Sequence, residues 1–171
     1  MPYTAVALAR TPDGWNAQEV DLDGVSDIDE VDDLIREVDP DAYVTLLFVE
    51  QDDEYVAIVR LDADAEEPRV FVSDGRAADT YPLVQMLADA IDESEASGGG
   101  SSAPVDELDA DAPPGHDAEP LGDADLLADL GTRRRDLLAL CAQEGTLPSD
   151  VITEVCERAG CLDELEALRV P

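Results

Sequence analysis

The sequence predicts an α+β protein with an N-terminal antiparallel sheet and two helices, an acidic disordered linker, and a small C-terminal helical bundle. Apolar runs of strand length alternate with turn signals in the first half of the chain. A stretch rich in Gly, Ser, Pro and Asp follows, and the last third carries apolar residues at helical spacing between glycines. The chain therefore divides into an α+β domain at 1–93, a linker at 94–120 and a helical domain at 121–171.

The first residues predict a β-hairpin followed by a helix. Residues 3–9 are apolar and suit a strand, and the turn at 11–14 leads into a looser return strand. Ser26 suits the N-cap of a helix because acidic residues, which favour the first turn, come directly after it. One helical face then carries apolar residues at spacings of three and four: Ile28, Val31, Leu34, Ile35 and Val38.

Two longer apolar runs predict the centre of the sheet. Residues 42–49 are almost continuously apolar, β-branched or aromatic, which is typical of a strand covered on both faces. Residues 54–61 follow a short acidic turn and predict the hairpin partner of that strand. A short strand at 69–72 and a helix at 81–91 complete the order β-β-α-β-β-β-α, which indicates an antiparallel sheet covered by two helices.

Glycines divide the last third of the chain into several short helices. Gly131, Gly145 and Gly160 each suit the position after a helix C-terminus, where a left-handed backbone is common. The first helix is expected to open at Asp123 or Asp125, and the second is expected to have Thr132 as its N-cap. The residues at 121–171 suffice for a small helical bundle.

The charge of the chain is extreme. It holds 43 acidic and 10 basic residues, all of the latter Arg, for a net charge of −33. Such a charge argues against nucleic-acid binding through phosphate contacts and against docking on anionic lipid. It is compatible with a basic protein partner, metal cations or a high-salt cytoplasm. The charge is uneven, with −19 on 1–92, −10 on 93–125 and −4 on 126–171.

Targeting and cysteine patterns predict a cytoplasmic protein. The first residues lack a basic stretch followed by a long apolar one, and no run is long enough to cross a bilayer. The three cysteines, Cys141, Cys156 and Cys161, include no Cys-x-x-Cys pair and have no His nearby, so a closed zinc site is not expected. We expect buried helix-core thiols instead.

No catalytic constellation is recognisable in the sequence. His116, the sole His, lies in the linker, where nothing fixes its orientation or pKa, so Ser-His-Asp and Cys-His systems are excluded. The acidic stretch 21–33 lacks the spacing of a calcium loop, and the glycines at 98–100 lack the Lys of a phosphate loop. We therefore expect no catalytic residue, no metal site and no cofactor.

The turn at 73–76 is the most site-like feature of the N-terminal half. Asp74 and Arg76 follow a predicted buried strand and could lie side by side in a carboxylate-based or metal-assisted enzyme site. The simpler alternative is an ordinary strand-to-helix turn closed by an ion pair. Both interpretations remain open from the sequence.

Arg133, Arg134 and Arg135 form the one positive cluster. At the start of a predicted helix their charges oppose the helix dipole, so they could hold a phosphate or an acidic peptide in an anion- or nucleotide-sensing module. The alternative, which we favour, is pairing with the acidic linker or with Asp129 and Asp136.

Four stretches carry a resemblance to a known family: LLFVEQDDEY (46–55), RVFVSDGRA (69–77), GDADLLADLG (122–131) and GTLP (145–148). Together they resemble the actinobacterial tRNA adenosine deaminase-associated protein family, over nearly the whole chain. The family is named for occurring beside a tRNA adenosine deaminase, so the resemblance implies association with that enzyme. It does not imply deaminase activity, because the His-x-Glu and Pro-Cys-x-x-Cys of a zinc deaminase are missing here.

The expected function is that of a non-enzymatic accessory or interaction protein. Its partner would be a tRNA adenosine deaminase or another basic protein, since complementary fields favour such a complex. No direct nucleic-acid or membrane partner is expected. The enzyme site around Asp74 and Arg76 and the anion-sensing role of the Arg cluster are the alternatives.

Overall fold

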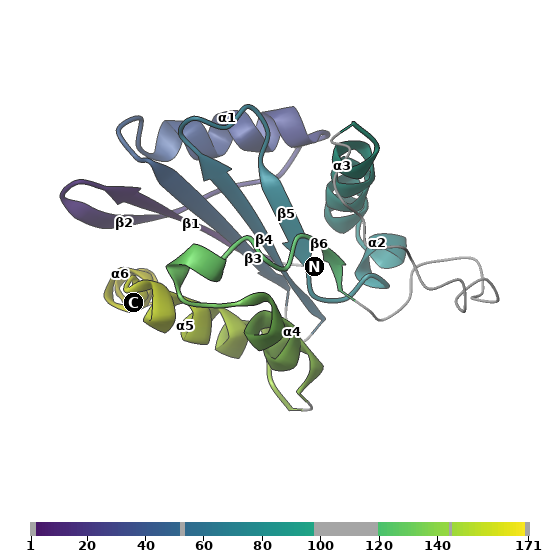
Figure 1. Cartoon of the computed structure of the whole chain (residues 1–171). Helices are drawn as coiled ribbons and strands as arrows, with labels where there is room; N and C mark the ends of the chain where they lie inside the picture. The colour runs from purple at the N-terminus through teal and green to yellow at the C-terminus, as the bar shows by residue number, and fades with distance from the viewer. Residues whose placement is uncertain (1–2, 52–53, 98–119, 144, 170–171) are drawn as a thin grey trace.

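A six-stranded antiparallel sheet in the order β2-β1-β3-β4-β5-β6 forms the centre of the molecule (Figure 1). The computed structural model of the chain describes residues 3–51, 54–97, 120–143 and 145–169. The strands are β1 (Thr4–Thr11), β2 (Gly14–Glu19), β3 (Val44–Gln51), β4 (Tyr55–Asp62), β5 (Arg69–Val72) and β6 (Leu121–Gly122). Residues 98–119 of the expected linker, with His116 among them, lie outside the described residues. The predicted start of the linker at 94 is wrong, because residues 94–97 form the last turn of helix α3 (Pro82–Ser97).

The central strands form where the sequence is apolar on both faces. β3 and β4 pair in a register that sets Leu47 beside Val59 and Phe48 beside Ile58. All four side chains are buried, because consecutive residues of a strand point to opposite faces and both faces are covered. The α+β class and the N-terminal antiparallel sheet predicted from the sequence are confirmed.

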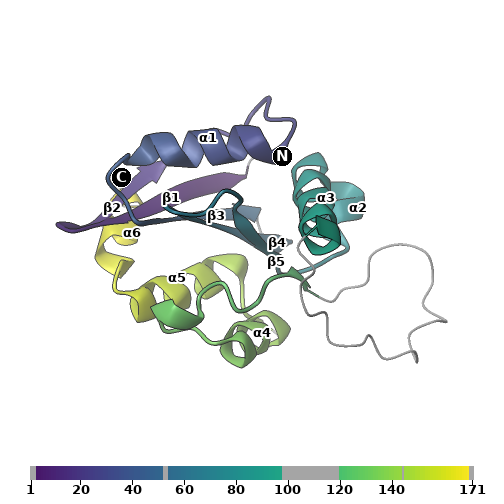
Figure 2. The same ribbon diagram turned by 45° about the horizontal axis from the view of Figure 1, so that its top comes forward.

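Three helices cover one face of the sheet: α1 (Ile28–Val38), α2 (Ala77–Thr80) and α3 (Pro82–Ser97) (Figure 2). α1 begins after Asp27, whose carboxylate accepts a hydrogen bond from the N–H of Glu30, so the N-cap lies one residue later than expected. α2 is a single turn that the sequence did not indicate. α3 continues beyond the predicted end at 91 because the residues that follow include good helix formers.

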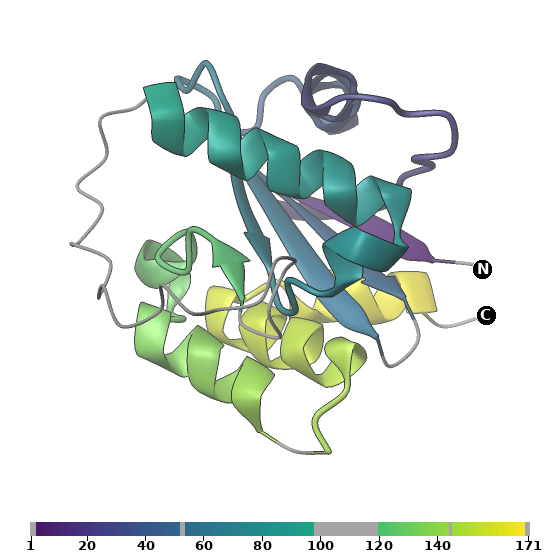
Figure 3. The same ribbon diagram turned by 90° about the vertical axis from the view of Figure 1, so that its right-hand side faces the viewer.

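The opposite face carries the C-terminal helices: α4 (Arg134–Ala142), α5 (Pro148–Ala159) and α6 (Leu162–Arg169) (Figures 2 and 3). Gly131 and Gly160 adopt left-handed backbone after their helices, as expected. Thr132 was expected to be the N-cap of α4, and this is wrong: Thr132 is buried and Arg133 holds the N-cap position.

The C-terminal helices share a hydrophobic core with the sheet. Val151, Ile152 and Val155 of α5 belong to the same buried cluster as Phe48 and Ile58 of the central strands. The sheet is therefore sandwiched between two helical layers. The division into two domains at 93 and 120 stays a prediction. The helices at 134–169 bury their apolar faces on the sheet, so whether each part folds independently needs a separate test.

The segment directly after the linker differs from the expected helix. Leu121 and Gly122 pair with Val72 and Phe71 as β6, and turns then lead to the 3₁₀ helix η2 (Ala128–Leu130). Asp123 accepts a hydrogen bond on its side chain from the N–H of Asp125, at 2.9 Å. Such side-chain bonds compete with helix formation, which explains why the apolar spacing here did not yield an α-helix.

Candidate functional site

Asp74 and Arg76 lie side by side in the turn between β5 and α2. Arg76 Nη2 is 2.9 Å from Asp74 Oδ2, and the Arg76 N–H donates to Asp74 Oδ1. The Arg76 side chain is 66% exposed, and its bond to Asp74 raises its pKa. The structure thus brings this predicted pair together as an ion pair between an exposed Arg76 and a half-buried Asp74, and the pair closes a turn. Its use in catalysis stays a prediction.

The three consecutive arginines at the start of α4 are all exposed. Arg134 Nη1 lies 3.5 Å from Asp125 Oδ2. Among the described residues, neither Arg133 nor Arg135 forms an ion pair. Anion binding by this cluster also stays a prediction.

The carboxylates that the sequence suggested as partners of this cluster pair elsewhere. Asp129 binds Arg60, and Asp136 Oδ2 lies 3.4 Å from Arg158 Nη1. The expected pairing is therefore wrong for these two acids. The reason is that the turns after β6 carry Asp129 back toward the sheet.

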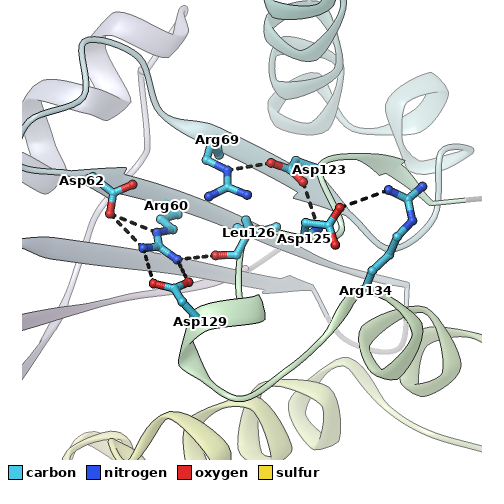
Figure 4. Close-up of polar contacts among 8 residues, drawn as sticks. All are labelled: Arg60, Asp62, Arg69, Asp123, Asp125, Leu126, Asp129 and Arg134. Carbon is cyan, nitrogen blue, oxygen red and sulfur yellow. Dashed lines mark hydrogen bonds and ion pairs between the residues drawn. The ribbon is translucent and has the colours of Figure 1, made fainter. Parts of the chain in front are cut away.

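Arg60 is the centre of an ion-pair network that the sequence did not reveal (Figure 4). It lies in β4, and its side chain is 8% exposed. Both its Nη atoms donate to the carboxylate of Asp129, with an Nη2–Oδ2 distance of 2.9 Å. Nε and Nη2 also donate to Asp62, and Nη1 donates to the carbonyl oxygen of Leu126 at 2.6 Å. The planar guanidinium thus satisfies its donors in a nearly buried position.

The pairing of Arg60 and Asp129 stabilises the charged form of each. The hydrogen bond to Asp129 raises the pKa of Arg60, against the opposing effect of burial. The same contact lowers the pKa of the Asp129 carboxyl, although burial acts in the other direction. Both groups are therefore ionised at neutral pH.

A separate series of charged contacts begins at Arg69, which pairs with Arg60 in the strand register, and reaches the start of α4. Nε of Arg69 in β5 lies 2.6 Å from Oδ2 of Asp123. The Asp123 carboxylate also accepts a hydrogen bond from the N–H of Asp125. Asp125 in turn pairs with Arg134. Two neighbouring strands therefore hold the segment 123–134 through charged contacts. The one signal in the sequence was Arg60 itself, a charged residue inside an otherwise apolar strand.

A groove lies between the loop at 21–27 and α3, and we call it the α3 groove. One end is a cavity of about 570 Å³. Its floor and walls include three tyrosines and the apolar side chains that surround them: Tyr3, Tyr55, Tyr81, Leu22, Val25, Leu83 and Met86. A second cavity of about 350 Å³ shares Ser26, Pro82 and Met86 with the first and continues it along α3.

The tyrosines of the α3 groove are held in fixed positions. Tyr55 is 1% exposed, donates its hydroxyl to Gln51 and packs against Tyr81 with ring centroids 5.2 Å apart. The Tyr3 hydroxyl accepts from the N–H of Leu22 and donates to Asp23. Burial raises the pKa of both Tyr3 and Tyr55, so their hydroxyls are neutral donors at physiological pH.

Carboxylates line both parts of the α3 groove. Asp23 borders the tyrosine end, and Asp27, Asp89 and Glu93 border the second cavity. Among the described residues that line the two cavities, none is an Arg. The sequence showed the acidic stretch 21–33, but it gave no sign that this stretch faces the acids of a later helix.

The cysteines pack in or against the hydrophobic core that the C-terminal helices share with the sheet. Cys156 and Cys161 are fully buried there, as expected for helix-core thiols, and the pKa of the half-buried Cys141 is raised to about 11 by burial. Within the described ranges, no group of three or more His, Cys, Asp or Glu side chains is arranged to hold a metal ion. In the same part of the chain, no helix combines the length and apolar character needed to cross a membrane.

The fold and these surfaces define a class of protein. It is an acidic α+β protein whose six-stranded sheet lies between two helical layers, and a carboxylate-lined groove runs beside α3 in one of these layers. The chain belongs to the Rv3753c-like tRNA adenosine deaminase-associated protein family, whose model matches residues 3–162. This match confirms the family resemblance of the sequence. Comparison with curated proteins and with solved structures found no match.

Proposed function

We propose that this chain is a non-enzymatic accessory protein that binds a tRNA adenosine deaminase and acts in tRNA modification through that complex. The observation that carries the proposal is the family match over residues 3–162, because the family is described as deaminase-associated. The net charge of −33 also supports the proposal. An enzyme that binds tRNA needs a basic surface for the phosphates, and such a surface attracts an acidic protein.

The distribution of the arginines supports a surface suited to a basic partner. Among the described residues, six arginines pair with acids of the same chain: Arg36, Arg60, Arg69, Arg76, Arg134 and Arg158. These pairs neutralise only a few of the 43 acidic residues. The remaining excess of carboxylates creates a negative field that would speed encounter with a basic protein and repel free nucleic acid.

Co-purification tests the proposal. The full chain is mixed with the tRNA adenosine deaminase of the same organism at about 50 mM and about 500 mM salt, after ribonuclease treatment. We expect a complex at low salt that weakens at high salt, and no conversion of adenosine to inosine by the chain alone. The absence of a complex at low salt would overturn the proposed partner. Deamination by the isolated chain would overturn the non-enzymatic role.

A further inference from the structure

We propose that the α3 groove is the docking site for a basic segment of the partner, which presents an Arg or Lys side chain together with an apolar one. This inference rests on the proposed function for the identity of the partner, but the chemistry of the groove can be tested separately. The occupant that we infer is a protein segment, because the groove combines an apolar floor with an acidic border.

The apolar part of the groove offers contact area. Val25, Leu83 and Met86 are half-buried, and Tyr81 beside them is only partly covered. Burying such side chains against an apolar group of the partner is favourable in proportion to the area removed from water. Met86 borders both cavities, so one apolar side chain placed there would lie between the tyrosines and the acids of α3.

The charged part of the groove selects a cation. Four carboxylates line it, from Asp23, Asp27, Asp89 and Glu93. Among the described residues, none of the four forms an ion pair with an Arg of this chain. A guanidinium or ammonium group entering the groove would therefore meet acids that no internal base neutralises, and it could also stack on a tyrosine ring.

Charge also decides against other occupants. A second copy of this chain carries the same net charge of −33 and would bring like charges into the groove. A nucleic acid would bring its phosphates next to the same carboxylates. A basic protein segment is thus the occupant whose charge the groove complements.

Charge reversal on α3 tests the inference with a matched control. Asp89→Lys/Glu93→Lys changes two exposed residues of the groove, and Glu157→Lys/Glu166→Lys changes two exposed residues of α5 and α6. Both double variants change the net charge equally, so a loss of binding that depends on net charge alone would be the same in each. Binding of the deaminase to the full chain is measured by calorimetry at about 100 mM salt, where exposed charges act over about 10 Å.

We expect the groove variant to weaken binding about tenfold and the control about twofold or less, because only the first places cations at the binding site. Equal weakening by both variants would overturn the groove as the docking site. If the wild-type chain fails to bind the deaminase, the proposed function fails. The same variants are then titrated with a synthetic peptide of alternating Arg and Leu, and equal affinities would overturn the inference as well.

Photocrosslinking gives a second measurement that does not depend on charge reversal. A photoreactive residue replaces Gln85, which is exposed and lines the groove, or Gln18, which is exposed on β2. In the complex we expect crosslinks from position 85 to a partner segment that contains Arg or Lys, identified by mass spectrometry, and none from position 18. A complex that forms without crosslinks from position 85 would overturn the inference.

Discussion

Arg60 and Asp129 lie 69 positions apart in the chain and form a bidentate ion pair between the central sheet and the segment that follows the linker. The arginine is nearly buried, whereas the Asp129 side chain is 62% exposed. The pair therefore anchors the exposed turn that contains Asp129 to strand β4 of the sheet. A buried guanidinium needs such partners, because an unpaired charge in this position would be costly.

Removing the carboxylate should destabilise the fold. We expect Asp129→Asn to lower the free energy of unfolding by about 1 to 2 kcal/mol, because Arg60 keeps Asp62 and Leu126 as partners but loses its strongest one. Urea denaturation measures the change.

The matched control is Asp125→Asn, which removes an exposed partner of Arg134. Its expected cost is below about 0.5 kcal/mol, as is usual for exposed pairs. Equal losses in the free energy of unfolding for Asp129→Asn and Asp125→Asn would show that the contact between Arg60 and Asp129 adds no more stability than an exposed pair.

Acidification should remove the contribution of Asp129. Arg60 lowers the pKa of the Asp129 carboxyl, so the pair stabilises the folded state above the unfolded pKa of an aspartate, and this stabilisation is lost as the pH falls toward the folded pKa. We expect the difference in unfolding free energy between wild type and Asp129→Asn to be constant above about pH 5 and to shrink below about pH 4. Urea titrations at a series of pH values measure it, and a difference that grows on acidification would contradict the assignment.

Gly122 should be intolerant of a side chain. Its φ is +91°, and a Cβ atom at this position would lie 2.1 Å from the carbonyl oxygen of Val70, so β6 would have to leave the sheet edge. We expect Gly122→Ala to cost at least about 2 kcal/mol of stability. Gly24 is the matched control, because its φ is +85° but a Cβ there meets no atom within 4 Å; Gly24→Ala should cost only about 1 kcal/mol. Similar melting temperatures of the two variants would argue against the packing of β6.

Salt should stabilise the protein. At a net charge of −33, self-repulsion opposes the compact state, and raising sodium chloride from about 10 mM to about 1 M shortens the screening length from about 30 Å to about 3 Å. We expect the melting temperature to rise by several degrees, as calorimetry would measure. Salt also weakens the ion pairs, so a falling melting temperature would mean that these pairs outweigh the repulsion.

Separating the two helical layers should unfold both parts. Residues 1–97 alone would expose the sheet face that holds Phe48, Ile58 and Phe71, and residues 120–171 alone would lose the surface on which their helices pack. We expect neither fragment to melt cooperatively by circular dichroism, and mixing them to restore the signal of the full chain. Two fragments that each melt cooperatively would instead show that the boundaries predicted from the sequence mark independent domains.

Local patterns predicted most of the regular structure. The strand predicted at 69–72 is β5 with the same bounds, and the two central strands lie within two residues of their predicted bounds. These elements were predictable because side-chain periodicity and turn residues act within a few positions. β6 was not, since two residues carry no pattern and their pairing with Phe71 and Val72 comes from a distant part of the chain.

The candidate sites were less predictable. The contact between Asp74 and Arg76 follows from their closeness in sequence, and it was anticipated. The partners of Arg60 and the walls of the α3 groove come from separate elements, so no spacing along the chain could reveal them. Only the odd placement of a charged residue in a buried strand marked Arg60 in advance.

The acidity of the chain, the kinds of elements and most of their order follow from composition and periodicity, which are local properties. Three features depend on the folded chain: the C-terminal helices pack on the sheet, Asp129 reaches Arg60, and the acids of the loop at 21–27 and of α3 border one groove. These contacts depend on strand order and on which apolar faces are buried together, so they arise only when distant segments are brought into one core.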